Sequence, residues 1–73
     1  MVRYQNGESG IQFYDCGDDF IRIQFADGTV YLYTYGSAGS SNIEEMKRLA
    51  QIGKGLNTFI NKNVRGNFAK RER

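Results

Sequence analysis

The stretch from Gly28 to Tyr35 constrains the fold of this chain more than any other, because three tyrosines alternate in it with Val, Leu and Thr. Aromatic and β-branched residues with a period of two predict a half-buried β-strand. The Asp27-Gly28 pair at its start is a turn signal, and residues 20–25 before it alternate in the same way. The two segments therefore predict a β-hairpin around which the remaining elements are arranged.

The segments on either side of the hairpin predict an α+β domain. Residues 11–15 form a further alternating run, so three strands are expected in an antiparallel meander. After the hairpin, apolar residues recur at helical spacing in residues 42–52 and again in residues 55–65, and Gly53 between them suits a left-handed helix end. The sequence thus predicts a single α+β domain, a three-stranded antiparallel β-meander followed by two helices packed on one face.

The ends of the elements and of the chain carry their own signals. Ser41 and Glu44 have the spacing of a capping box, which predicts the start of the first helix there. The first and last residues of the chain show little periodicity. We therefore expect flexible ends at residues 1–8 and 69–73, with an ordered body at about 9–68.

Composition narrows the classes of function. The 73 residues are enough for one thin core, and 40% hydrophobic with 25% charged residues is ordinary for a globular domain. The chain has no histidine and a single cysteine, which disfavours zinc sites and the usual general base. Acidic neighbours would raise the pKa of the Cys16 thiol, so we expect an unreactive, half-buried residue at a strand end. No enzymatic activity, cofactor or metal is therefore expected.

The sequence carries no signal for a membrane or for secretion. No apolar run approaches the ~20 residues of a membrane-spanning helix, and residues 1–7 lack the apolar core of a signal peptide. A single cysteine without an internal partner fits a reducing compartment. We expect a cytoplasmic protein with no membrane partner.

The net charge of +2 is unevenly distributed. Residues 1–41 hold two basic and five acidic side chains, a balance of −3, whereas residues 42–73 hold eight basic and three acidic ones, a balance of +5. A basic second half indicates a polyanionic partner, although a solvated helix face is the plainer interpretation. The residues expected to contact RNA are Lys54, Asn57, Asn61, Lys62, Arg65, Lys70 and Arg71. For Asn57, a role as helix N-cap is the alternative.

Two registers of the hairpin give the tyrosines opposite roles. A two-residue loop would place Tyr31 and Tyr33 on an outer face with Arg22, as an aromatic and basic platform for nucleic-acid bases. A three-residue loop with Gly28 in a left-handed conformation would turn both tyrosines into the core. We favour the second register, because two helices need a broad apolar face of the sheet to pack on. The residues that it turns outward are Val30, Leu32 and Thr34.

These segments together resemble the KTSC domain, a short module found at the C-terminus of some lysyl-tRNA synthetases and as stand-alone small bacterial proteins. The resemblance covers about Ser9 to Phe68, but Gly36 to Ser41 stands where the family often has a Val-Pro step. It is carried by Ile11-x-Phe13-Tyr14-Asp15, Ile21-x-Ile23-x-Phe25, Gly28-x-x-Tyr31-x-Tyr33 and Ala50-x-x-Gly53-Lys54-Gly55-Leu56-Asn57-x-Phe59-Ile60-x-x-x-Val64-Arg65-x-x-Phe68. The resemblance implies RNA binding only through the family's attachment to a synthetase.

The function expected from the sequence is a small non-catalytic binding module. RNA is the leading partner, bound through the basic helical surface of the C-terminal half. A module for protein interaction or homo-oligomeric assembly is the alternative, since the outward apolar residues of the hairpin could bind another protein or a second copy of the chain.

Overall fold

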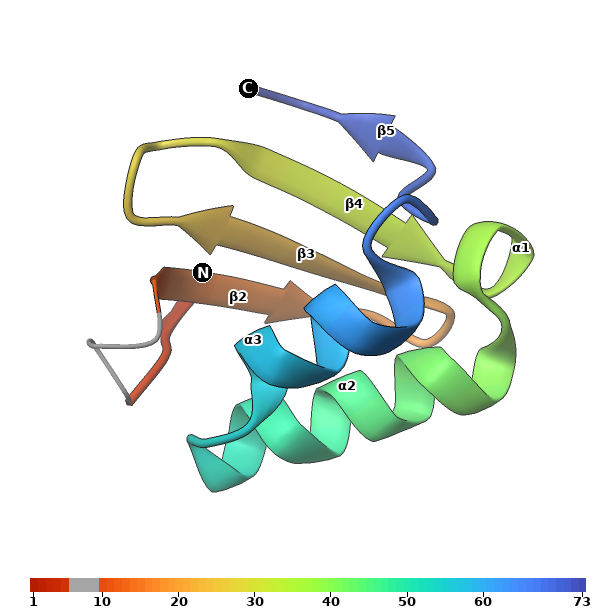
Figure 1. The fold of residues 1–73 in the computed structure, drawn as a ribbon, viewed down its shortest axis with the longest axis horizontal. Coiled ribbons are helices and arrows are strands. Elements are labelled where there is room, and N and C mark those ends of the chain that lie inside the picture. Colours follow the sequence, from red (N-terminus) through yellow and green to blue (C-terminus); the bar gives the residue numbers. More distant parts are fainter. Residues whose placement is uncertain (6–9) are drawn as a thin grey trace.

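The computed structural model describes residues 1–5 and 10–73 and shows an antiparallel sheet with helices packed on one face (Figure 1). The strands lie side by side in chain order, as β1 (Val2–Arg3), β2 (Ile11–Cys16), β3 (Phe20–Phe25), β4 (Val30–Thr34) and β5 (Lys70–Arg71). The helices lie between β4 and β5 in the chain, as α1 (Tyr35–Ala38), α2 (Ser40–Ile52), α3 (Leu56–Phe59) and the π-helical η2 (Ile60–Val64). The predicted α+β class is confirmed.

The meander of β2, β3 and β4 is confirmed, but the predicted number of three strands is wrong. A two-residue strand extends the sheet at each edge, with Val2 opposite Tyr14 at one edge and Arg71 opposite Tyr31 at the other. Both additions come from segments that were expected to be flexible. Periodicity could not predict them, because strands of two residues are too short to show a pattern.

The first segment is held by Tyr4, which is 1% exposed. Its backbone N–H donates to the carbonyl of Gln12 (N···O 2.8 Å), and its hydroxyl accepts from the N–H of Leu56 (3.4 Å). A buried aromatic ring with its polar group satisfied anchors the segment to both the sheet and the helices. Residues 6–8 of the expected flexible lead-in lie outside the described residues.

The last segment is held along β4. The backbone N–H groups of Ala69 and Glu72 donate to the carbonyls of Leu32 and Val30, each at 2.7 Å. An edge strand offers such unpaired groups to any extended segment that can reach it. The tail supplies that segment here, so β4 becomes an interior strand.

The hairpin adopts the three-residue loop with Gly28 at φ 90°. The N–H of Phe25 donates to the carbonyl of Thr29 (2.8 Å), and the N–H of Gly28 donates back to the carbonyl of Phe25 (2.9 Å). Ile21 therefore pairs with Tyr33, which is 2% exposed, and the favoured core register is confirmed. Tyr31, one pair along, is half-buried.

A single core lies between the sheet and the helices. Its members are apolar residues of every large element and the buried ring of the lead-in, namely Tyr4, Ile11, Ile21, Ile23, Tyr33, Ala38, Ile43, Met46, Ala50, Leu56, Ile60 and Val64. The apolar stripes predicted for the two helical segments supply half of this set. Among the described residues, no helix has the length and apolar character needed to cross a membrane.

The predicted capping box of Ser41 and Glu44 is wrong. Helix α2 begins at Ser40 after Gly39, which has no side chain to act as a cap, so Ser41 lies inside the helix. The Glu44 carboxylate accepts instead from the hydroxyl of Tyr35 and from Nζ of Lys47. The capping box of this structure lies one element earlier, at α1. There the side chain of Thr34 accepts from the N–H of Ser37, and the Ser37 hydroxyl accepts from the N–H of Thr34.

Glycines lie at the end of α2 and at the start of α3. Gly53 ends α2 in the predicted left-handed conformation, and its N–H donates to the carbonyl of Leu49 (2.9 Å). Helix α3 begins after Gly55, so Asn57 lies inside this helix and is not its N-cap. The second predicted helix is present, and its second half is the π-helical turn η2.

Replacement of Gly28 by alanine tests the constraint on the hairpin register. A Cβ at Gly28 meets no atom within 4 Å, so the cost arises only from the left-handed φ. We expect Gly28→Ala to lower the free energy of unfolding by about 1–2 kcal/mol. Gly66→Ala is the matched control, since Gly66 is equally uncrowded and lacks a positive φ. Equal losses in denaturant unfolding of the two variants would contradict the interpretation.

Candidate binding site

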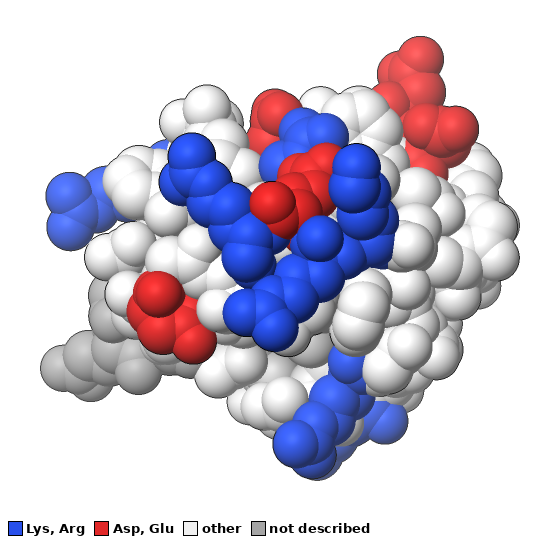
Figure 2. Space-filling model, turned by 90° about the horizontal axis from the view of Figure 1, so that it is seen from above, with Lys and Arg blue, Asp and Glu red and all other residues white. Residues whose placement is uncertain are grey.

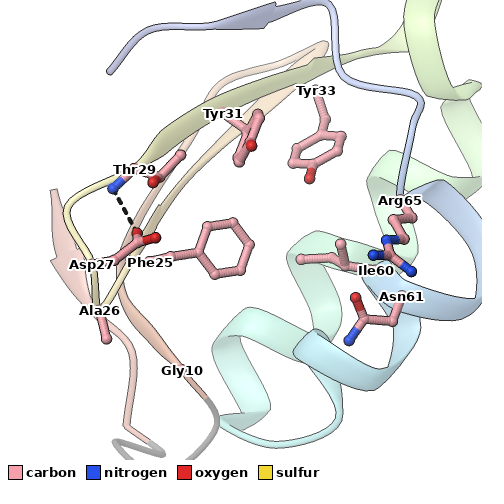
Figure 3. Close-up of a pocket in the computed structure, with 10 residues that line it drawn as sticks. All are labelled: Gly10, Phe25, Ala26, Asp27, Thr29, Tyr31, Tyr33, Ile60, Asn61 and Arg65. Carbon is pink, nitrogen blue, oxygen red and sulfur yellow. Dashed lines mark hydrogen bonds between the residues drawn. The ribbon is translucent and has the colours of Figure 1, made fainter.

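A pocket of about 380 Å³ opens between the β3–β4 hairpin and the helical layer, on the helix-covered side of the sheet (Figure 3). It is lined by Gly10, Phe25, Ala26, Asp27, Thr29, Tyr31, Tyr33, Ile60, Asn61 and Arg65. This volume is within the range of about 300–1,000 Å³ that is usual for small-molecule sites. The combination of aromatic rings with a few polar groups is also typical of binding sites.

One wall of the pocket is aromatic. The rings of Phe25 and Tyr31 meet edge to face, with centroids 5.9 Å apart, and Tyr31 lies 6.4 Å from Tyr33. Phe68 packs on Tyr31 at 4.6 Å and fixes its position. The wall exists because the hairpin register turns both tyrosines toward the helices, where Tyr33 is buried and Tyr31 stays half-buried.

The opposite wall is helical and polar. Ile60 forms its buried part, and Asn61 in η2 and Arg65 directly after η2 are exposed and directed toward the pocket (Figure 3). The two polar residues are four positions apart, a spacing that places them on the same side of a helical turn. An amide and a guanidinium therefore face the aromatic wall.

The hairpin loop closes one end of the pocket with a carboxylate. Oδ1 of Asp27 accepts from the backbone N–H of Thr29 (2.9 Å). Hydrogen bonds from the side chain and backbone of Thr29 lower the pKa of Asp27, and the charge of Arg71 lowers it further. Asp27 is therefore ionised at neutral pH, and the pocket has an acidic end at the hairpin and a basic side at Arg65.

The structure brings together only part of the residue set that was expected to contact RNA. Asn61 and Arg65 line the pocket, whereas the other five predicted residues are not part of its lining. Lys54 is exposed between α2 and α3, Lys62 is exposed in η2, and Asn57 is half-buried in α3.

Lys70 and Arg71 are consecutive residues of β5, so they face opposite sides of the sheet. Arg71 pairs with Tyr31 on the pocket side, and Lys70 pairs with Leu32 on the outer side. One surface therefore cannot include all seven predicted residues.

Sequence reasoning missed Phe25, Asp27 and Thr29 as site residues, and it considered the tyrosines only as core or as an outer platform. The favoured register, with Gly28 in a left-handed loop, could have indicated these residues, because it places the end of the hairpin beside the second helical segment. How far that helix leaves the rings uncovered depends on packing, which the residue pattern does not encode.

The outer face of the sheet holds a second group of charges. Arg22 forms ion pairs with Asp15 on β2 (Nη1···Oδ2 3.2 Å) and, through Nε, with Glu72 beside β5. The hydrogen bond from Arg22 to Glu72 is the largest cause of the raised pKa of Arg22. Figure 2 shows the β5 side of the molecule, where blue side chains surround a small group of red ones. The carboxylates there offset much of the positive charge.

The outward apolar residues of the hairpin are more covered than expected. Val30 is 5% exposed, and Leu32 and Thr34 are half-buried. Side chains of the ionic group, Arg22 and Glu72, lie around Val30 on this face. The face is therefore not an open apolar patch.

Cys16 lies at the predicted position, the end of β2, but it is exposed rather than half-buried. Partial desolvation is the main cause of the raised pKa of its thiol, and Asp15 and Glu44 add to this effect against the opposing charge of Lys47. A raised pKa disfavours the reactive thiolate. In the part of the chain that the structure describes, no group of three or more His, Cys, Asp or Glu residues could hold a metal ion.

The comparisons with known proteins give no match. No protein-family model matches the chain, and neither a curated protein nor a solved structure is significantly similar to it. The resemblance to the KTSC domain stays a prediction that rests on the residue pattern alone. A function for this chain has to be argued from the geometry of its site.

The buried phenol of Tyr33 predicts a loss of stability at alkaline pH. Burial, with a smaller contribution from Tyr31, raises the pKa of Tyr33 from 10.0 to about 12. Between these values the unfolded chain releases a proton that the folded protein retains, so the unfolding free energy falls as the pH rises. Because a tenfold change in a proton equilibrium corresponds to roughly 1.4 kcal/mol, the loss reaches about 2 kcal/mol by about pH 11.5.

Denaturant unfolding from about pH 9 to about pH 11.5 measures this loss in the natural protein and in Tyr33→Phe. We expect the variant to lose less stability over this range, because it has no phenol to ionise at this position. At lower pH the difference between the two proteins should be constant. Parallel curves up to about pH 11.5 would show that Tyr33 ionises normally.

Proposed function

We propose that this chain is a small non-catalytic RNA-binding module of the cytoplasm, and that it holds a single-stranded segment across the pocket between the hairpin and η2. The observation that carries the proposal is the position of Arg65 and Asn61 opposite the aromatic wall of Tyr31 and Phe25. An aromatic ring can stack on an unpaired base, and a guanidinium beside it can bind the adjoining phosphate. A duplex hides the faces of its bases, so the arrangement favours a single strand.

The charges around the pocket support this proposal. Lys54, Lys62 and Arg65 are exposed, and none of them forms an ion pair with another described residue. Lys47 and Arg48 of α2 are paired with Glu44 and Glu45. No carboxylate of the described residues therefore pairs with these three cations, which leaves them available to phosphate groups. The resemblance to the KTSC domain agrees with the same partner by analogy.

The chemistry of the pocket supports a binding role over a catalytic one. Asp27 is the one carboxylate of its lining, which includes no thiol or imidazole among the described residues. The Thr29 side chain hydrogen-bonds to Asp27, but the lowered pKa of this carboxylate makes it a weak general base.

A module for protein interaction or homo-oligomeric assembly is the alternative proposal. It required an apolar outer face on the hairpin, and the burial of Val30 makes that face less suited to a partner. Sedimentation over a range of protein concentrations measures the alternative directly, since self-association would raise the apparent mass.

Binding of a fluorescently labelled, mixed-sequence single-stranded RNA of about ten nucleotides tests the RNA proposal by anisotropy. Arg65→Gln removes one phosphate contact, so we expect the affinity at low salt to fall about fivefold or more. The slope of log affinity against log salt should become shallower by about 0.7. Arg48→Gln is the matched control, because it removes the same charge from a residue paired on α2.

Two outcomes would contradict the RNA proposal. One is the absence of binding at low salt and millimolar RNA, and the other is an equal effect of Arg65→Gln and Arg48→Gln. Amide shifts of the labelled protein locate the bound strand. We expect them at Tyr31, Asn61 and Arg65, with disappearance at high salt.

A further inference from the structure

The pocket carries opposite charges on two of its sides. A carboxylate, Asp27, stands at the hairpin end, and a guanidinium, Arg65, stands on the helical side, with the aromatic wall between them (Figure 3). A ligand that fits this arrangement is flat, offers hydrogen-bond donors at one edge and carries negative charge at a distance from that edge. A nucleotide has this form when its base presents donors.

The carboxylate of Asp27 can accept further hydrogen bonds. Two carboxylate oxygens provide about four acceptor sites. The backbone N–H of Thr29 donates to one of these sites, on Oδ1 (2.9 Å), and the exposed carboxylate has further acceptor sites for a ligand. The loop holds the group ionised, and an ionised carboxylate only accepts hydrogen bonds.

The four bases of RNA differ in the donors that they offer. Guanine presents two adjacent donors on its Watson–Crick edge, the N1–H and the N2 amino group. Adenine and cytosine each present one amino group beside an acceptor, and uracil presents one N–H between two acceptors. A carboxylate is therefore matched in two hydrogen bonds only by guanine, and it meets an acceptor lone pair at every other base.

We propose that the pocket selects an unstacked guanine, with Asp27 as the residue that determines this specificity. The proposal rests on the RNA-binding function proposed above and adds the identity of the base. The guanine ring lies along the aromatic wall, its donor edge faces Asp27, and its phosphate is bound by Arg65. The amide of Asn61 offers a donor to the acceptor groups of the same base.

Pentanucleotides with four uridines and one variable central base test the selection. We expect the guanine pentamer to bind about five- to a hundredfold more tightly than the adenine, cytosine and uridine pentamers, the range of one good bidentate base contact. An inosine pentamer keeps the N1–H but lacks the N2 amino group. The inosine pentamer should therefore bind less tightly than the guanine pentamer to the same, unchanged protein.

Asp27→Asn tests the residue. Asparagine keeps an Oδ1 acceptor for the N–H of Thr29, so the loop is preserved, but it loses the second acceptor oxygen. We expect the guanine preference to disappear while binding of the uridine pentamer persists. Asp18→Asn is the matched control, since it removes one charge from an exposed turn residue outside the pocket lining and should leave the preference intact.

The outcomes separate this proposal from the one on which it rests. Equal affinity for all four pentamers, or a guanine preference that survives in Asp27→Asn, would overturn the role of Asp27 while RNA binding stands. A preference for another base would do the same. Absence of binding to every pentamer, under conditions that also abolish binding of the longer RNA, would overturn both proposals.

Discussion

The register of the β3–β4 hairpin is the constraint on which the rest of the structure depends. Gly28 allows a three-residue loop, and the loop pairs Ile21 with Tyr33 and Ile23 with Tyr31. A shift of one residue would reverse the face of every side chain on β4. The core would then lose Tyr33, and the pocket would lose its aromatic wall.

The chain ends reinforce this arrangement from both sides of the sheet. Tyr4 joins β2 to the start of α3 through its buried ring and hydroxyl, which helps to position the helical segment that carries the polar wall of the pocket. Phe68 packs on Tyr31, and Glu72 bonds to Arg22 across the outer face. Segments that lack periodicity thus contribute to the geometry of a site formed by periodic ones.

Residue types predicted structure correctly where a residue's conformation depends on the residue itself. They failed where side chains elsewhere in the fold compete for the same hydrogen bonds. Gly53 ends α2 as its type suggests, because a left-handed conformation is a property of the residue itself. Glu44 has the spacing for a capping box, yet Tyr35 and Lys47 engage its carboxylate. Similarly, Arg65 was predicted as an RNA contact from its charge and Asn61 from its amide, but Asp27 joins them in the pocket lining only through the fold.

The sequence alone determined the α+β class, the central meander, the positions of the two main helical segments and a preference for the core register. These follow from periodicity and glycine chemistry, which act over a few residues. Only the tertiary structure decided that two-residue strands close the sheet edges, and that the tyrosines form core and pocket wall together. Such features depend on contacts between segments far apart in the chain, since Arg22 meets Glu72 and Tyr31 faces Arg65 only after the helices have packed on the sheet.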